Sequence, residues 1–203
     1  MNEPLKLRSC VGALIFNEDG QVLLGKRSSV KKTSVGRWQL PQGGVEVEKN
    51  EDYYAAVVRE IKEEVGLSIN SNCLRYVSKV NHPITYTYAP DDPENTKRKF
   101  SGQTIHWYLF YMPADKIASV DLTYEAEPEF QEVKWYDFKK FVTDADMGVP
   151  FKSEMYKQLF LETFPIIDHY LIDVKATIIQ SGGKIGNTST VDNNNNNNHK
   201  IDT

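Results

Sequence analysis

The chain has 203 residues, which suits one domain with a substantial hydrophobic core. Hydrophobic residues make up 40% and charged residues 26%, and no apolar run approaches the roughly 20 residues that a membrane helix needs. The net charge of −4 excludes a broadly basic nucleic-acid-binding surface but allows a local basic pocket. The N-terminal residues lack the apolar core of a signal peptide. We therefore expect a cytoplasmic protein without membrane contact, and a nuclear location is also compatible with the sequence.

The first elements form a hairpin pattern. Val11–Phe16 and Val22–Lys26 are β-type runs, and the turn residues 17–20 separate them. A polar loop over residues 28–36 leads to Trp38-Gln39-Leu40-Pro41-Gln42-Gly43-Gly44. This Gly-Gly turn comes shortly before the most informative stretch of the chain.

Residues from Tyr54 to Val65 have the pattern of an amphipathic helix that ends at Gly66. Another face of this helix carries three acidic side chains, those of Glu60, Glu63 and Glu64. Like charges at helical spacing repel by roughly 0.2–0.5 kcal/mol per pair, so they do not serve the stability of the helix itself. Carboxylates on a rigid element are ligands that hard divalent cations prefer. We expect a metal-binding helix; the alternative is a solvated acidic face.

Beyond this helix the pattern predicts three strands and a second helix. The strands are expected at Cys73–Val80, Thr104–Met112 and Val133–Tyr136, and a loop is expected over residues 89–99. The second helix should cover Phe151–Phe164 and stop at Pro165. The order of strands, helix, strands and helix suits an α/β/α sandwich around a mixed sheet.

The C-terminal segment differs in composition from the rest of the chain. From about Ser181 onward Gly, Ser, Thr and Asn dominate, and residues 193–198 are all Asn. Such a segment cannot bury enough apolar surface to offset its chain entropy. We therefore divide the chain into a folded domain, residues 1–175, and a disordered Asn-rich tail, residues 176–203.

The segment from Gly44 to Leu67 resembles the Nudix box. That pattern is Gly, five residues, Glu, seven residues, Arg-Glu, an aliphatic residue, any residue, Glu-Glu, any residue, Gly and an aliphatic residue. The match is complete from Glu51 to Leu67, whereas six residues instead of five separate Gly44 from Glu51. The resemblance implies the α/β/α sandwich fold and an enzyme that cleaves a pyrophosphate linkage in a nucleoside diphosphate joined to another moiety.

Shorter sequence words indicate one branch of this family. The stretch from Trp38 to Gly44 is similar to that of the branch that contains asymmetric diadenosine tetraphosphate hydrolases and RNA 5′-pyrophosphohydrolases. Three further stretches agree with this branch: Gly102-Gln103, Glu127-Pro128-Glu129-Phe130 and Phe151-Lys152. The resemblance covers roughly residues 8–164.

This branch implies a metal-dependent Nudix hydrolase that cleaves diadenosine tetraphosphate asymmetrically to ATP and AMP. The first alternative is an RNA 5′-end pyrophosphohydrolase that removes a 5′-triphosphate or nucleotide cap. The second is a non-catalytic nucleotide- or RNA-binding module, which the intact Glu cluster argues against. The expected cofactor is Mg²⁺ or Mn²⁺. The expected partners are a nucleoside polyphosphate or an RNA 5′ end, and no obligate protein partner is evident.

By resemblance, Glu60, Glu63 and Glu64 hold the metal ions and the Gly43 carbonyl adds a ligand. Either Glu63 or Glu129 takes the proton from the attacking water, and the sequence leaves this choice open. Arg59 joins this catalytic group, because it is expected to pair with Glu51 and so orient the ligand helix.

The substrate-binding residues are expected to be of two kinds. Arg8, Arg27 and Lys152 are candidates for phosphate contacts, and the alternative for each is a solvated surface charge. Tyr86 and Tyr88, placed in a loop after the third strand, are candidates to stack on a base with Phe151 opposite, although sheet packing would also explain them. The remaining members of this predicted set are Gln42 and Gln103.

Overall fold

A computed structural model of the protein describes residues 6–30, 34–69, 73–88 and 99–180. The predicted loop over residues 89–99 therefore lies almost entirely outside the described residues, as do residues 181–203 of the predicted tail. Within the described part of the chain, no helix combines the length and apolarity needed to cross a membrane.

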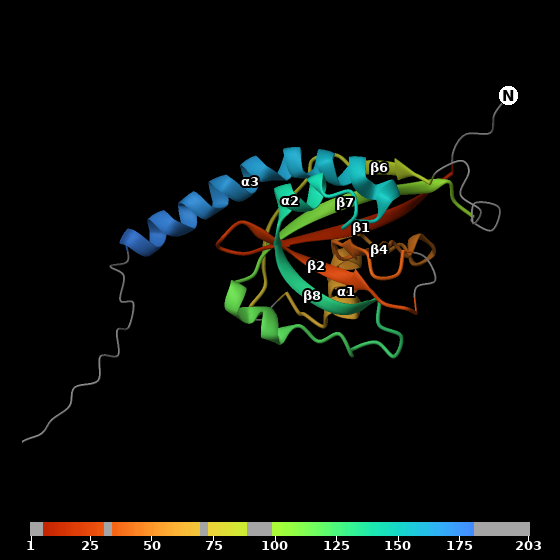
Figure 1. Cartoon of the computed structure of the whole chain (residues 1–203), viewed down its shortest axis with the longest axis horizontal. Coiled ribbons are helices and arrows are strands. Elements are labelled where there is room, and N and C mark those ends of the chain that lie inside the picture. The colour runs from red at the N-terminus through yellow and green to blue at the C-terminus, as the bar shows by residue number, and fades with distance from the viewer. Residues whose placement is uncertain (1–5, 31–33, 70–72, 89–98, 181–203) are drawn as a thin grey trace, which may run out of the picture.

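The fold is built on one mixed sheet (Figure 1). The strands are β1 (Leu7–Phe16), β2 (Gln21–Arg27), β3 (Trp38–Gln39), β4 (Gln42–Gly44), β5 (Arg75–Lys79), β6 (Ile84–Thr87), β7 (Gly102–Tyr111) and β8 (Phe130–Asp137). Their order is β3-β2-β1-β7-β5, and β8, β4 and β6 pair with β2, β1 and β7. Strands β1 and β7 run parallel, from Leu7 opposite Gly102 to Phe16 opposite Tyr111. The other pairings of named strands are antiparallel.

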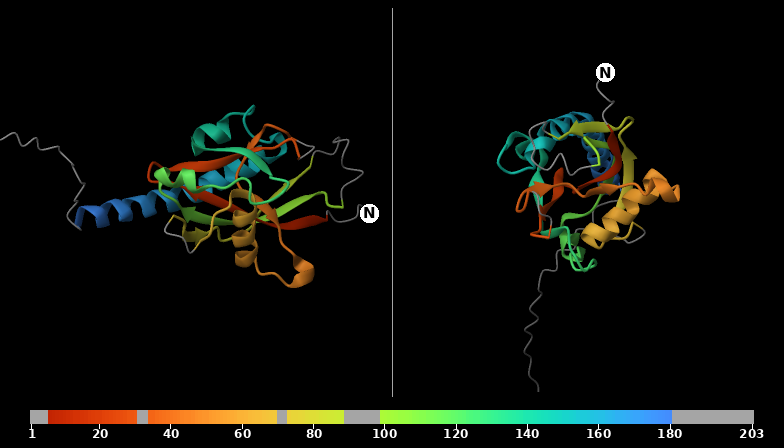
Figure 2. Two further views of the ribbon diagram at one scale, coloured as in Figure 1. Left: turned by 90° about the horizontal axis from the view of Figure 1, so that it is seen from below. Right: turned by 90° about the vertical axis from the view of Figure 1, so that its right-hand side faces the viewer.

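Helices cover both faces of the sheet, as expected for an α/β/α sandwich. Figure 2 shows α1 (Tyr53–Val65) on one side and α3 (Ser153–Gln180) on the other, where α2 (Phe138–Thr143) also packs. Side chains alternate across β1, so Leu14 packs in the core beneath α3 and Ile15 in the core beneath α1. The 3₁₀ helices are η1 (Val47–Lys49), η3 (Ala114–Ser119) and η4 (Pro150–Lys152). The predicted fold class is confirmed.

Helix α1 has clear start and stop signals. The Asp52 side chain accepts hydrogen bonds from the backbone N–H groups of Tyr54 (2.8 Å) and Ala55 (3.1 Å), which otherwise lack partners in the first turn. At the other end Gly66 has φ 68°, a left-handed conformation that glycine adopts without strain. The predicted acidic helix is therefore present within one residue of its expected start.

Two local predictions were wrong. Tyr86 does not lie in a loop but in the edge strand β6, which pairs with β7. Helix α3 does not stop at Pro165 but continues to Gln180. Proline removes the N–H that would bond to the carbonyl of residue 161, but Leu161 faces solvent (70% exposed), where water can satisfy that carbonyl. Burial of Ile167 one half-turn later holds the helix against the core.

Candidate active site

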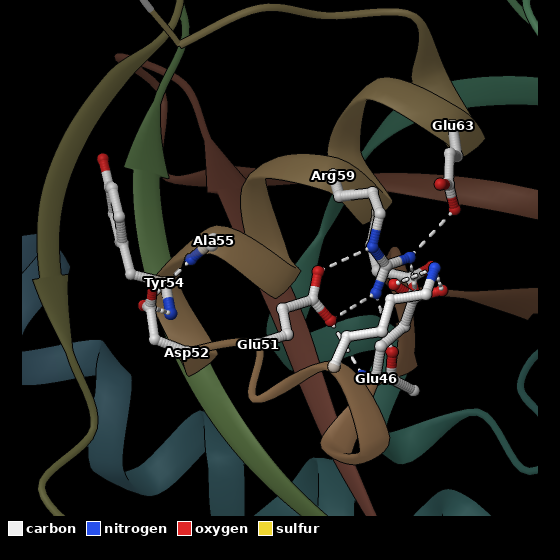
Figure 3. Close-up of polar contacts among 10 residues, drawn as sticks. Glu46, Glu51, Asp52, Tyr54, Ala55, Arg59 and Glu63 are labelled. Atoms are coloured by element: carbon white, nitrogen blue, oxygen red, sulfur yellow. Dashed lines mark hydrogen bonds and ion pairs between the residues drawn. The ribbon is translucent and has the colours of Figure 1, made fainter.

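Arg59 connects the acidic helix to the loop that precedes it (Figure 3). Its Nε and Nη2 atoms donate to the two carboxylate oxygens of Glu51 at 2.8 and 2.9 Å. Nη2 also donates to the Gly44 carbonyl at 2.8 Å, and Nη1 donates to Glu60 (2.8 Å) and Glu63 (3.1 Å). The expected ion pair between Arg59 and Glu51 is therefore present. Together with the hydrogen bond to the Gly44 carbonyl, this pair fixes both ends of the loop between Gly44 and Glu51 to Arg59 on α1.

The extra residue in this loop is accommodated locally. Residues 47–49 form the 3₁₀ turn η1, and Asn50 adopts a left-handed conformation with φ 54°, which Asn tolerates better than most residues. The Glu46 backbone N–H then donates to the Glu51 carboxylate at 2.8 Å. The loop therefore bulges without moving Glu51 away from Arg59.

The three acids of α1 have different surroundings. The Glu60 carboxylate lies directly over Gly43, where any larger side chain would collide with it. The Glu64 carboxylate is buried and accepts a hydrogen bond from the Gln42 backbone N–H at 2.9 Å. Glu63 is the most exposed of the three, and Arg59 binds its carboxylate.

Burial and mutual repulsion change the acidity of this cluster. Burial, helped by the nearby carboxylates of Glu129 and Glu60, raises the pKa of Glu64 well above its usual value. Burial also raises the pKa of Glu60, although the Arg59 guanidinium opposes this effect. Among the described residues, no group of three or more His, Cys, Asp or Glu side chains is gathered closely enough to bind a metal as placed. Instead, the carboxylates of Glu60 and Glu63 accept hydrogen bonds from Arg59, and the carboxylate of Glu64 accepts one from the Gln42 N–H group.

Opposite the acidic cluster, four side chains form a hydrogen-bonded network. Arg27 Nη1 donates to Glu129 at 2.8 Å and to Gln39 Oε1 at 3.1 Å. Gln39 in turn donates to Glu129 at 3.1 Å and accepts a hydrogen bond from Lys152 Nζ at 2.9 Å. Lys152 is 5% exposed, and burial lowers its pKa to about 7, with the Arg27 charge acting in the same direction. Gln39 thus links two cations to one carboxylate.

A cleft of about 300 Å³ separates the three acids of α1, the acidic wall, from this network. Its lining comprises Arg8, Arg27, Gln39, Gln42, Gly43, Gly44, Glu60, Gln103, Glu129 and Lys152. The guanidinium of Arg8 lies over Gly44, and Gln42 donates to Gln103 at 3.1 Å. The buried Oε1 atom of Gln42 has no hydrogen-bond partner among the described residues.

An aromatic pocket of about 140 Å³ adjoins this cleft and shares Arg27, Gln39, Gln103 and Lys152 with it. Its aromatic lining consists of Tyr86, Tyr88 and Phe151. The ring centroids of Tyr86 and Tyr88 lie 5.5 and 5.4 Å from that of Phe151. The rings therefore pack on one another and also line a pocket, and stacking on a base stays a prediction.

The structure brings most of the predicted site residues to these two cavities. Exceptions are Arg59, Glu63 and Glu64, which do not line either cavity. Gln39 was missed as a site residue, although it stands in the quoted Trp-Gln word. Ser28 was also missed; its hydroxyl donates to the Pro128 carbonyl at 2.6 Å and so fixes the loop that carries Glu129. A sequence signal for Ser28 was absent, because 100 residues separate the two partners.

Comparison with known proteins agrees with this geometry. The family model described as NUDIX domain matches residues 6–159. An RNA pyrophosphohydrolase from Wolbachia pipientis subsp. Culex pipiens (strain wPip) is 32% identical over 175 residues, which cover 85% of this chain and 99% of that protein.

Solved structures show the same fold. The E. coli dihydroneopterin triphosphate pyrophosphohydrolase matches with a TM-score of 0.56 and 18% identity over 84% of this chain and 99% of that one. A C. elegans Ap4A hydrolase in a binary complex matches with a TM-score of 0.50 and 21% identity over 76% of this chain and 98% of that one. Nudix enzymes generally use divalent metal ions. The chain belongs to the Nudix family and is a Nudix pyrophosphohydrolase.

Proposed function

We propose that this chain hydrolyses a phosphoanhydride bond at the 5′ end of RNA, in the cytoplasm, with Mg²⁺ or Mn²⁺ as cofactor. The Wolbachia relative, matched over nearly its whole length, carries the name RNA pyrophosphohydrolase. The short sequence motifs ranked diadenosine tetraphosphate as the first candidate substrate and the RNA 5′ end as the second. The relatives support the second substrate better than the first.

The observation that carries the proposal is the junction of the two cavities. Arg27 and Lys152 line both the cleft and the aromatic pocket. A terminal nucleotide with its base in the pocket would place its phosphate chain beside these cations and Arg8. Arg8 makes no ion pair with a described residue, so its guanidinium is available to phosphate oxygens.

The donor set of the acidic wall fits divalent cations. Glu64 is a buried carboxylate close to two others, an arrangement that a divalent cation would stabilise. We assign the ions to Glu60, Glu63 and Glu64 with the Gly43 carbonyl, and Glu129 faces them across the cleft. When bound, such ions neutralise phosphate oxygens and lower the pKa of a coordinated water.

The chain's own groups position the reacting atoms. Arg27 and Gln39 hold the Glu129 carboxylate at the edge of the cleft, where it is placed to accept a proton from attacking water. Glu63 remains the alternative base, and Arg59 holds it in turn. The pair of Arg59 and Glu51 keeps α1 in register with the Gly-Gly turn.

The test is a direct comparison of two substrates. A 5′-triphosphorylated oligonucleotide should be turned over with a higher kcat/KM than diadenosine tetraphosphate in Mg²⁺ or Mn²⁺, and the folded Glu64→Gln variant should turn over neither. Turnover of the dinucleotide alone would reject the RNA substrate but keep the hydrolase chemistry. Equal rates for wild type and Glu64→Gln would reject the assigned metal site.

A further inference from the structure

A second and larger cavity lies at the end of the molecule away from the cleft. Its volume is about 510 Å³, and the β1–β2 turn, the start of α2 and the stretch of α3 from Phe160 to Lys175 form it. Figure 1 shows the C-terminal part of α3 extending past the strands on the side opposite β4. The described residues that line this groove include none that line the cleft.

Helix α3 presents an exposed stripe to this groove. Phe164 and Ile172 are 54% and 57% exposed, which is high for large apolar side chains. At 100° per residue, Phe164, Asp168, Leu171, Ile172 and Lys175 fall within an arc of about 100°. All five line the groove. Leu171 is half-buried and packs against the core of its own chain, so Phe164 and Ile172 supply the exposed apolar surface of this stripe. Two exposed large apolar side chains on one face of a helix indicate a surface that packs against another element.

Two opposite charges stand at the centre of the stripe. Asp168 and Lys175 are seven residues apart, or about two helical turns. The ion pairs found among the described residues include neither of them; the pair nearest in sequence joins His169 to Asp173 instead. Both charges are therefore available to a partner surface.

These positions are self-complementary. If two copies of α3 cross in antiparallel fashion about a point between Leu171 and Ile172, Asp168 of each copy faces Lys175 of the other. Leu171 and Ile172 then flank the two-fold axis symmetrically, because each lies about 50° to one side of it. The same stripe supplies both halves of the contact, which is the property of an isologous interface.

We propose that this groove binds α3 of a second copy of the chain and that the protein forms a two-fold symmetric dimer. The argument for a second copy is charge complementarity, since one helix carries both members of both ion pairs. The contact also covers the apolar stripe that α3 otherwise exposes beyond the sheet.

The test is the mass of the full chain in solution, measured by analytical ultracentrifugation over a range of concentrations. The wild type should show a concentration-dependent dimer. Lys175→Asp places like charges opposite each other at two symmetric positions, and should raise the dissociation constant roughly tenfold or more. The double reversal Asp168→Lys with Lys175→Asp should restore it to within about threefold of the wild type.

Asp173→Lys is the matched control, because it makes the same charge change as Asp168→Lys on the opposite face of the same helix. It should leave the dimer intact, whereas Ile172→Glu should dissociate it. Each variant should keep wild-type turnover, because the groove and the cleft share no residue. A wild type that stays monomeric at every concentration would overturn the proposal, as would a double reversal no tighter than Lys175→Asp alone.

Discussion

Replacing Arg59 by Ala should destabilise the protein by about 2–4 kcal/mol. The figure comes from the contacts and burial of the side chain. Arg59 forms a two-atom pair with Glu51 at 2.8 and 2.9 Å, and the two side chains are 27% and 12% exposed. Breaking a fully buried pair costs about 3–5 kcal/mol, and a surface pair is worth about 0–1 kcal/mol. Partial burial places this pair between the two limits, nearer the first.

Urea unfolding at pH 7 and low salt measures the loss directly. Glu51→Gln should produce part of the same loss, and a cycle with the double variant should show a favourable coupling between the two residues. Arg59→Lys keeps the charge but not the two-atom geometry, and should fall between the wild type and Arg59→Ala.

The difference between the wild type and Arg59→Ala should also depend on pH. The Arg59 hydrogen bonds hold the pKa of Glu51 below its usual 4.5. A lowered folded-state pKa contributes stability above 4.5 that is lost as pH falls through the folded value. The difference should therefore shrink below pH 4.5. A loss under about 0.5 kcal/mol at pH 7, or a difference that grows in acid, would refute the assigned pair.

Three further outcomes are expected. Gly43→Ala inserts a methyl group into the space of the Glu60 carboxylate and should cost about 1–3 kcal/mol in stability as well as metal affinity; wild-type values in urea unfolding and metal titration would contradict this contact. Glu64→Gln removes a buried acid with a raised pKa, whose charging opposes folding as pH rises above 4.5. The variant should therefore gain in metal-free Tm relative to wild type as pH increases from 5 to 8 and lose the Mg²⁺-dependent rise in Tm; a retained rise would count against Glu64 as a ligand. Lys152, with its pKa lowered to about 7, loses its charge above that pH in the free enzyme. The kcat/KM should therefore fall above about pH 7, and Lys152→Arg should extend activity to higher pH; identical pH profiles would exclude Lys152 as the titrating group.

The limits of sequence reasoning are visible in particular elements. The helix around Glu60 was predicted nearly to the residue, because its apolar period and its terminal glycine are both local signals. Strand β6 was missed because the short run of residues 84–87 carries no clear strand pattern, and only its pairing with β7 at the edge of the sheet defines it. The end of α3 was misplaced for a related reason: packing of Ile167 onto the core outweighs the local effect of Pro165.

The sequence by itself determined the acidic helix, because spacing along one helix and one turn is a local signal. Resemblance of the segment from Gly44 to Leu67 to the Nudix box indicated the family, and this resemblance together with the order of elements indicated the fold class. Only the tertiary structure decided which residues from other parts of the chain join that helix to form the site. Gln39, Glu129 and Lys152 come from three segments that lie up to 113 residues apart, and chain folding alone makes them one network. The same holds for the groove beside α3, whose acidic and basic residues acquire meaning only once the β1–β2 turn and α2 are placed against that helix. Local periodicity fixes which face of a helix is apolar, whereas the partner that covers this face depends on contacts between distant parts of the chain, or between two chains.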